Sequence, residues 1–231
     1  MSSKPIIDVI IPAYNEENAI GLVLDEIPKD LVRRVVVADN NSTDKTTSVA
    51  EKHGAIVVFQ PKPGYGNACL KAMGFIAQQK VKPDIVVFLD GDYSDYPEQL
   101  NEVVAPILDD KADLVIGSRA SGNSESGSLT PQQVFGNWLA TRLLKLFYGV
   151  AFTDLGPFRA IRYKSLLALE MNDPTYGWTV EMQIKAAKQK LRCAEVPVDY
   201  RVRIGQSKVS GTVKGTIGAG YKIILTLIKY L

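Results

Sequence analysis

The feature that most constrains the fold is an alternation of short β-branched runs with stretches of helical periodicity along the first half of the chain. Ile6–Pro12 is typical of a strand, and apolar residues recur at the spacing of one helix face between positions 20 and 27. Further strands are expected at Val35–Ala38, Ala55–Phe59, Asp84–Leu89 and Asp113–Gly117. Repeated βα units predict an α/β fold, a Rossmann-like three-layer α/β/α sandwich with a mostly parallel central sheet.

The pattern changes after Arg119. Residues 120–130 are rich in Ser and Gly, which predicts a loop. Apolar residues between Val134 and Phe147 then predict a strongly apolar helix, a further helix carries Trp178 and Met182, and a strand is expected from Arg192 to Tyr200. With 231 residues, 46% of them hydrophobic, the chain can bury one sizeable core.

Charge and composition exclude several classes of function. The 27 basic and 25 acidic residues leave a formal charge of +2, so no global field favours nucleic acid as a partner. Cys69 and Cys193 lack metal-ligand spacing and are expected to be free thiols in a reducing compartment. His53 is the one histidine, which excludes a His-rich zinc site, and its place before Gly54 is typical of a helix end, which favours a structural role over a Ser-His-Asp triad.

The two ends of the sequence bear on localisation. No succession of basic segment, apolar core and cleavage site follows Met1, so we expect no signal peptide. The apolar stretch Thr216–Leu231 is too short for a membrane span and contains Lys222 and Lys229, but it could lie along a membrane surface. These features predict a cytoplasmic protein, with peripheral contact to the membrane left open.

Polar residues follow three of the predicted strands. They are Tyr14-Asn15-Glu16, Asp39-Asn40-Asn41-Ser42 and Asp90-Gly91-Asp92. In parallel sheets, ligands bind beyond the carboxyl ends of the strands. We therefore expect all three segments to open onto one edge of the sheet and to form a ligand site.

The two carboxylates of Asp90-Gly91-Asp92 suit a hard divalent cation. Mg²⁺ or Mn²⁺ held by Asp90 and Asp92 would fill its other positions with phosphate oxygens and water. The alternative is a turn in which Asp and Gly supply favoured backbone conformations. Asp39 could accept from the imino N–H of a nucleotide base, Tyr14 could stack on that base, and Glu16 could accept from a ribose hydroxyl.

Other segments offer weaker signals. Gly64 and Gly66 lie in a Gly-rich loop before a helix, where backbone N–H groups could approach a phosphate or a sugar, although a flexible turn is the simpler interpretation. Arg203, Ser207 and Lys208 form a basic loop that could bind an anion or could be solvated. Of the two arginines in Gly156–Arg162, Arg159 is the one for which we favour a functional role.

The motifs resemble those of the family-2 glycosyltransferases with the GT-A fold, in the same order and strand context, over nearly the whole chain. Three segments carry the resemblance: Ile11–Glu17, Val37–Asp44 and Asp90-Gly91-Asp92. The first of them includes Pro12, and the second includes Asn41. The later segments Gly156–Ala160, Glu181–Gln183, Glu195–Val198 and Arg203–Lys208 are similar to the branch that contains dolichyl-phosphate mannose synthases and polyprenyl-phosphate glucosyltransferases.

The resemblance implies a metal-dependent, inverting hexosyltransferase that moves a sugar from a UDP- or GDP-sugar to a polyprenyl phosphate at a membrane surface. It implies one GT-A domain over 1–231, with a nucleotide-sugar-binding half (1–118), an acceptor-side half (119–211) and a C-terminal amphipathic helix (212–231). Asp39 would contact the base, Asp90 the ribose or metal side, and Asp92 the metal and the diphosphate. Arg203 and Lys208 would hold the diphosphate or the acceptor phosphate.

The same resemblance implies that Arg159 and Glu181 lie near the acceptor. A phosphate acceptor is already anionic and needs no strong general base, whereas a hydroxyl acceptor would need a carboxylate such as Asp154 or Glu181. Three alternatives stay open: a glycosyltransferase with a soluble or glycan acceptor, a sugar nucleotidyltransferase, and a non-catalytic sugar-nucleotide-binding module. The sugar, the choice between Mg²⁺ and Mn²⁺ and the oligomeric state, a homo-oligomer included, also stay open.

Overall fold

The computed structural model describes residues 4–205 and 213–231. Its core is a seven-stranded sheet with the strand order β3-β2-β1-β4-β6-β5-β7. Every neighbouring pair is parallel except those of β6, which is antiparallel to both β4 and β5. The strands are β1 (Ile7–Ala13), β2 (Val32–Asp39), β3 (Ile56–Phe59), β4 (Ile85–Phe88), β5 (Leu114–Ser118), β6 (Arg159–Arg162) and β7 (Cys193–Pro197).

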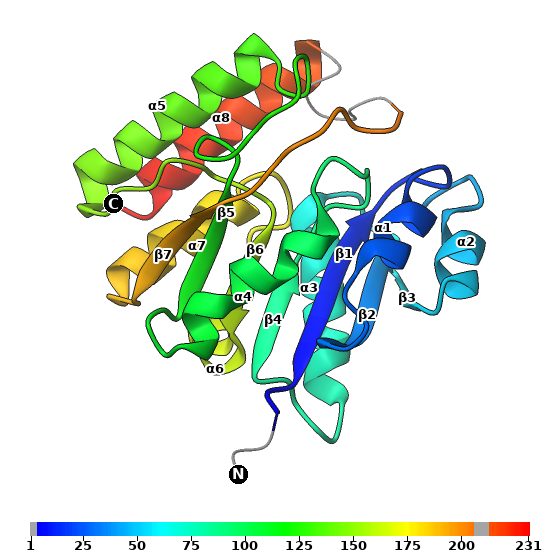
Figure 1. Cartoon of the computed structure of the whole chain (residues 1–231). Helices are drawn as coiled ribbons and strands as arrows, with labels where there is room; N and C mark the ends of the chain where they lie inside the picture. The colour runs from blue at the N-terminus through cyan, green and yellow to red at the C-terminus, as the bar shows by residue number, and fades with distance from the viewer. Residues whose placement is uncertain (1–3, 206–212) are drawn as a thin grey trace.

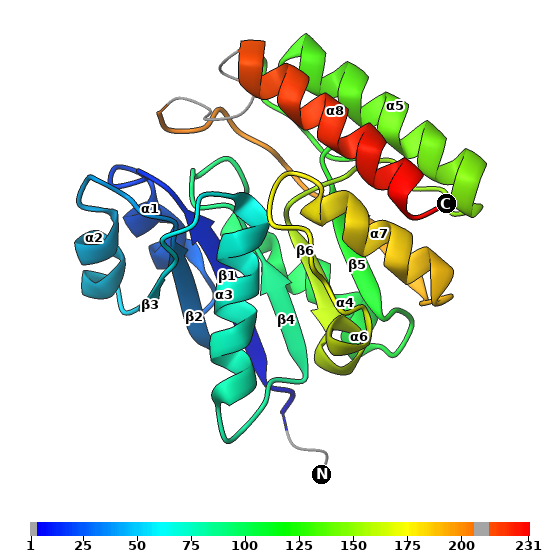
Figure 2. The ribbon, with the colours of Figure 1, turned by 180° about the vertical axis from the view of Figure 1, so that it is seen from behind.

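Helices cover both faces of this sheet (Figures 1 and 2). Buried residues of α1 (Ile20–Glu26), α2 (Thr46–Lys52) and α4 (Leu100–Leu108) pack on one face, and a short 3-10 turn, Pro97–Gln99, precedes α4. The other face is covered by α3 (Tyr65–Gln78), α5 (Pro131–Tyr148), α6 (Tyr163–Ala168), α7 (Trp178–Lys188) and α8 (Val213–Lys229). The predicted α/β fold with a mostly parallel sheet is confirmed.

Strand register brings the polar strand ends to one edge of the sheet. β1 is buried along almost its whole length, as expected for a strand with a helix layer on each side. Ala13 pairs with Asp39, so β1 and β2 end level with each other, and Ile10 pairs with Phe88 of β4. The segments after these three strands therefore leave the sheet together, as the sequence predicts.

Two elements escaped the sequence prediction. β6 is only four residues long and has an arginine at each end, which hides the apolar alternation of a strand. It enters the sheet antiparallel between β4 and β5, a position that depends on tertiary packing. The short helix α6 follows directly from it. The expected strand Arg192–Tyr200 is present but shorter, as β7.

The apolar helix expected around 134–147 is present as α5. Thr130 and Gln133 form a capping box at its start, and Gly149 ends it with φ 72°. Ala140 and Leu144 are buried, but most of the large apolar side chains of α5 face outward. α8 packs alongside it as the other outermost helix (Figures 1 and 2).

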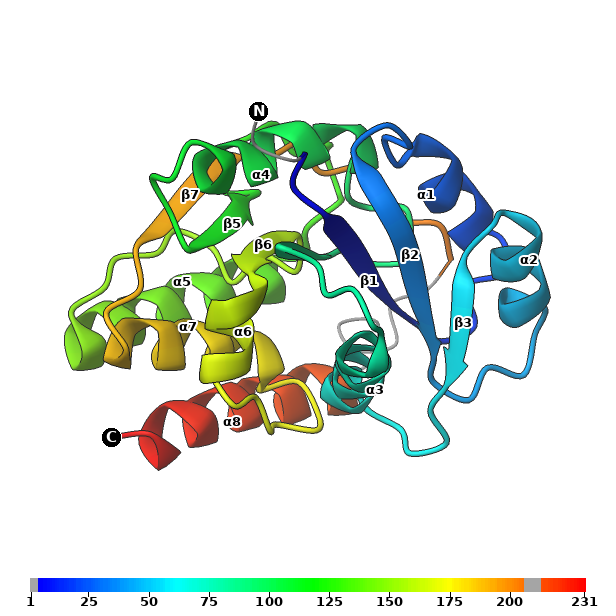
Figure 3. The ribbon, with the colours of Figure 1, turned by 90° about the horizontal axis from the view of Figure 1, so that it is seen from below.

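The view from below separates the two ends of the sheet (Figure 3). β1, β2 and β3 stand beside α1 and α2, whereas β5 and β7 lie on the side of α4 and α5.

Among the described residues, no helix combines the length and apolarity that crossing a bilayer requires.

Candidate active site

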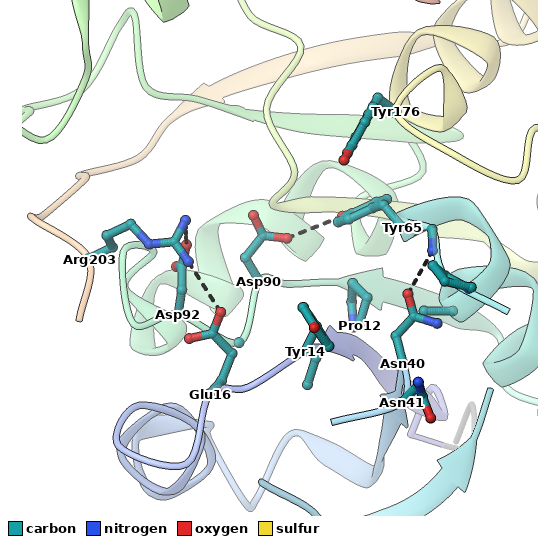
Figure 4. Close-up of a pocket in the computed structure, with 15 residues that line it drawn as sticks. Pro12, Tyr14, Glu16, Asn40, Asn41, Tyr65, Asp90, Asp92, Tyr176 and Arg203 are labelled. Atoms are coloured by element: carbon teal, nitrogen blue, oxygen red, sulfur yellow. Dashed lines mark hydrogen bonds and ion pairs between the residues drawn. The ribbon is translucent and has the colours of Figure 1, made fainter. Parts of the chain in front are cut away.

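A cavity of about 400 Å³ lies at the strand-end edge, where the sequence places the ligand site (Figure 4). Its floor comes from the segments after β1, β2 and β4. The predicted residues that line it are Pro12, Tyr14, Glu16, Asn41, Gly64, Asp90, Gly91, Asp92 and Arg203. A volume of this size is typical of small-ligand and cofactor pockets.

The backbone is strained where each of the three strands ends. Asn15, Asn41 and Tyr93 adopt φ values of 54°, 68° and 66°. Asparagine tolerates this left-handed region, but a tyrosine there is uncommon and costs conformational energy. Hydrogen bonds between the first two turns hold them together: the Ser42 hydroxyl accepts from the Asn15 N–H (2.9 Å), and the Asn15 side chain accepts from the N–H of Thr43 (2.8 Å).

Asp90 and Asp92 project from the end of β4 into the cavity. The Tyr65 hydroxyl donates to Asp90 Oδ1 (3.2 Å). Asp92 Oδ1 accepts from the N–H of Ser94 (3.0 Å), and Asp92 Oδ2 pairs with Arg203 Nη1 (3.0 Å). Arg203 Nη2 also reaches Glu16 Oε1 (3.2 Å), so one guanidinium joins the segments after β1, β4 and β7 (Figure 4).

The carboxylates at the end of β4 crowd one another. Burial first, and then the Asp92 charge, raise the pKa of Asp90 to about 7. Asp95 belongs to the same cluster: burial and the charges of Asp90 and Asp92 raise its pKa well above the ordinary value. A cation bound between these groups would relieve the repulsion, which is the electrostatic condition for a metal site.

A second cavity of about 580 Å³ adjoins the first. Tyr65, Asp90, Asp92, Tyr176 and Arg203 line both, so the two spaces meet at the carboxylate pair. From there the second cavity runs between α5 and α8 along mostly apolar side chains. Those residues include Phe135, Leu139, Ala140, Leu143, Leu155, Ile223 and Ile224.

Arg119 adds a cation to this second cavity. It follows β5 directly, and its guanidinium forms a bidentate pair with buried Asp154 (2.7 and 2.8 Å). The guanidinium also lies 5.1 Å from the centre of the Tyr200 ring. Arg119 and Arg203 thus place two guanidinium groups near the carboxylate pair, at the inner end of a cavity whose remaining lining is mostly apolar.

Two of the predicted donor-site residues lie outside the cavity lining. Asp39 is buried at the end of β2 and accepts from the N–H of Ser42 (3.2 Å). Gly66 packs against backbone, and a Cβ there would lie 1.9 Å from the Asp173 carbonyl oxygen. Gly66 therefore permits a close backbone contact, which corrects the expectation that it approaches a ligand.

Arg159 is another correction. Its side chain is fully buried, and its guanidinium donates to the carbonyl oxygens of Gly156 (3.0 Å), Leu155 (2.6 Å) and Thr179 (3.0 Å). Burial lowers the pKa of Arg159 to about 10. Since Leu155 and Thr179 line the second cavity, Arg159 supports that wall from behind, and its own side chain is not part of the lining.

Glu181 is likewise buried and lines neither cavity. It accepts from the N–H groups of Asn172 (3.1 Å) and Asp173 (2.7 Å), and it pairs with Lys185 (2.9 Å). The Tyr230 hydroxyl donates to it as well (2.6 Å). With all of these partners, Glu181 anchors the segment before α7 and the end of α8, which corrects its predicted place at the acceptor.

Ser207 and Lys208 lie outside the described residues. Asn40, which belongs to the predicted strand-end segment 39–42, lines the first cavity. Three residues that line the cavities escaped the sequence analysis, namely Tyr65, Arg119 and Tyr176. Arg119 directly follows β5, so the rule that ligands bind beyond strand ends would have found it. Tyr65 and Tyr176 carry no such signal.

This geometry agrees with a comparison of sequences. The profile of the family described as Glycosyl transferase family 2 matches residues 8–169, which include β1, β2, β4 and all of their strand-end segments. The chain belongs to this family. The family resemblance found in the sequence is confirmed, and the chain is a glycosyltransferase.

Individual relatives are similar to this glycosyltransferase over most of its length. An uncharacterised glycosyltransferase of Mycobacterium tuberculosis is 37% identical over 213 residues, covering 91% of this chain and 93% of that protein. A dolichyl-phosphate hexose transferase of Haloferax volcanii is 32% identical, covering 87% and 85%. Among solved structures, glucosyl-3-phosphoglycerate synthase from M. tuberculosis, in complex with Mn²⁺, UDP and phosphoglyceric acid, matches with a TM-score of 0.77 and 25% identity, covering 98% and 78%.

Proposed function

We propose that this glycosyltransferase moves a sugar from a nucleoside-diphosphate sugar in the first cavity to a polyprenyl phosphate in the second. The observation that carries the proposal is the second cavity, which is mainly apolar, has Arg119 and Arg203 at its inner end, and meets the first cavity at Asp90 and Asp92. An isoprenoid chain needs an apolar cavity, and its phosphate needs cations.

The first cavity supports a nucleotide-sugar donor. Tyr14 is about half exposed on its wall, where it could stack on a base, and Glu16 lies beside it. Asp39 lies just behind the lining and is the proposed partner of the base. A small movement of the 40–42 turn would expose the Asp39 carboxylate to the cavity. The structurally similar synthase binds UDP, which supports a uridine nucleotide as the first donor to test.

The residues at the end of β4 fit a divalent cation. Asp90 and Asp92 are two hard oxygen donors, and Glu16 is the nearby third carboxylate of the cavity lining. Within the described residues, no three carboxylate, histidine or cysteine side chains already cluster as a complete site. Two carboxylates are the expected protein share when donor phosphates complete the coordination. The cation would supply charge for the departing diphosphate.

The remaining lining residues support an anionic acceptor. Among the described residues that line the two cavities, the carboxylates are Glu16, Asp90 and Asp92. Glu16 and Asp92 pair with Arg203, and Asp154, one candidate base, is engaged by Arg119. With Asp90 and Asp92 on the proposed cation and the other two carboxylates paired with arginines, an acceptor hydroxyl would have no carboxylate in this lining to take its proton, whereas a phosphate oxygen is already nucleophilic.

In the proposed reaction, an acceptor phosphate oxygen attacks the anomeric carbon from the face opposite the diphosphate. The new carbon–oxygen bond forms as the bond to the diphosphate oxygen breaks, so the configuration inverts. Arg119 would orient the acceptor phosphate. Arg203, released from Asp92 when a cation binds there, would turn to the leaving diphosphate.

A soluble phosphorylated acceptor is the second candidate. The similar synthase binds phosphoglyceric acid, which also presents an anion and would satisfy the same two arginines. The apolar length of the second cavity favours the lipid, because a small polar acceptor would leave that lining without a ligand.

A donor and acceptor panel tests the proposal. The full chain is incubated with UDP- and GDP-sugars, with Mn²⁺ or Mg²⁺, and with either a short polyprenyl phosphate or 3-phosphoglycerate, and products are identified by mass spectrometry. We expect a sugar–phosphate–lipid product. Glycosylation of phosphoglycerate with no lipid product under any donor would establish the second candidate instead.

A further inference from the structure

The outermost helices α5 and α8 lie side by side and both expose apolar side chains. On α8, Tyr221, Ile224, Leu225 and Ile228 follow the i, i+3, i+4, i+7 spacing of one helix face, and all four are exposed. On α5, the exposed apolar residues are Val134, Phe135, Trp138, Leu146 and Phe147. We call these nine residues the α5–α8 face. Exposed apolar patches of this kind mark interaction sites.

α8 is fixed to the body of the protein by its opposite side. Leu227 is buried, and its carbonyl oxygen accepts from the Tyr148 hydroxyl of α5 (2.7 Å). Lys222 pairs with Asp173 (3.0 Å), and the Tyr230 hydroxyl reaches Glu181. These contacts set the rotation of α8, so its apolar stripe faces outward in the folded protein.

The charge of the two helices favours an anionic partner for the α5–α8 face. The chain holds 25 acidic residues among 231, yet the 18 residues of α5 and the 17 of α8 include none. Exposed Arg142, Lys145 and Lys229 lie on these helices instead. Apolar and aromatic residues interleaved with cations are the composition of helices that lie in the interface of an anionic bilayer.

A second copy of this chain fits the face less well. A two-fold interface would bring the same cations of both copies together with no acidic residue of α5 or α8 to pair them. A bilayer with anionic headgroups offers both an apolar layer and the opposite charge.

The face is also continuous with the second cavity. Phe135 and Ile224 belong to the α5–α8 face and line that cavity at the same time. We infer that the α5–α8 face docks on the surface of an anionic membrane, so that the second cavity opens toward the lipid and its acceptor enters from the bilayer. The direction of entry rests on the proposed function, whereas the docking does not.

Vesicle binding tests this inference. The full chain is sedimented with phosphatidylcholine vesicles that contain or lack phosphatidylglycerol and contain no polyprenyl phosphate. We expect binding to the anionic vesicles that high salt weakens. Ile228→Glu should reduce it about tenfold, and replacing Arg142 and Lys145 by Gln about fivefold for each charge. Leu167→Glu is the matched control, because Leu167 is similarly exposed on α6, far from the face.

Tryptophan emission gives a second readout. Trp178 is fully buried, whereas Trp138 is 52% exposed on the α5–α8 face, so a vesicle-induced blue shift would come from Trp138. Trp138→Leu should abolish the shift. The inference is overturned if the wild type does not bind, if Ile228→Glu and Leu167→Glu bind equally, or if Ile228→Glu only dissociates a dimer.

A transfer assay separates this inference from the proposed function. Ile228 lines neither cavity, so Ile228→Glu should retain turnover of a short, water-soluble polyprenyl phosphate and lose turnover of a vesicle-embedded one. Vesicle binding without any glycolipid product would refute the proposed function alone. Glycolipid formation without vesicle binding would refute the docking alone.

Discussion

Replacing Asp92 by Asn tests the proposed metal site with little change of shape. Asparagine keeps an oxygen that can accept from the Ser94 N–H, as Asp92 Oδ1 does at 3.0 Å. The substitution removes the negative charge that pairs with Arg203 at 3.0 Å and that would face the cation. The variant should therefore fold and should lose metal-dependent turnover.

The size of both effects follows from these contacts. Loss of a charge-assisted hydrogen bond costs about 1–2 kcal/mol, and relief of the repulsion between Asp90 and Asp92 offsets part of it. The melting temperature should then change by less than about 4 °C. A catalytic cation stabilises the transition state by several kcal/mol, so turnover should fall by about 10³-fold.

Turnover of the nucleotide sugar is followed by release of the nucleoside diphosphate at saturating Mn²⁺, and calorimetry measures Mn²⁺ binding. Glu125→Gln is the control, because this carboxylate lines neither cavity. NMR titration should also show a lower pKa for Asp90 in the Asp92→Asn protein, since the Asp92 charge contributes to raising it. Turnover and Mn²⁺ affinity equal to those of the wild type would refute the metal assignment.

Three further predictions address the surroundings of the site. In the folded, metal-free protein the pKa of Asp90 is about 7, so this group keeps its proton to a higher pH than it does in the unfolded chain. Its contribution to the free energy of unfolding is therefore complete below about pH 4 and declines as the pH rises to 7. Urea titrations should show that Asp90→Asn flattens this part of the stability profile, and an unchanged profile would contradict the prediction. Arg119→Lys, which loses the bidentate pair with Asp154, should raise the KM for the acceptor about tenfold and leave the donor KM unchanged, and equal effects on both would argue against an acceptor role. Tyr230→Phe removes a hydrogen bond to buried Glu181 and should lower the melting temperature by about 2–6 °C in calorimetry, with catalytic constants that stay at the wild-type values; a changed kcat with no loss of stability would restore a catalytic role for Glu181.

The sequence predicts the parallel part of the sheet and its ligand edge because both depend on local patterns. Buried strands such as β1 and β4 are mostly apolar runs rich in β-branched residues, and the residues after them must lie beyond the carboxyl ends of a parallel sheet. Tyr14, Asp90 and Asp92 were found in this way, and they do line one cavity.

The sequence could not predict which charged side chains the fold would bury. Arg159 satisfies carbonyl oxygens on two other segments, and Glu181 satisfies N–H groups before α7, contacts that exist only after the chain has packed. Likewise, the pattern of α5 predicts a helix but not which of its apolar residues face outward. A motif shared with a family identified these residues without distinguishing a supporting role from contact with the ligand.

Anomalous diffraction from crystals soaked with UDP and Mn²⁺ would locate the cation itself. We expect a manganese peak between the carboxylates of Asp90 and Asp92, with the nucleotide in the first cavity, its base on Tyr14 and its diphosphate toward the metal. Density for the nucleotide elsewhere, or the absence of a metal peak at the end of β4 at saturating Mn²⁺, would contradict this expectation.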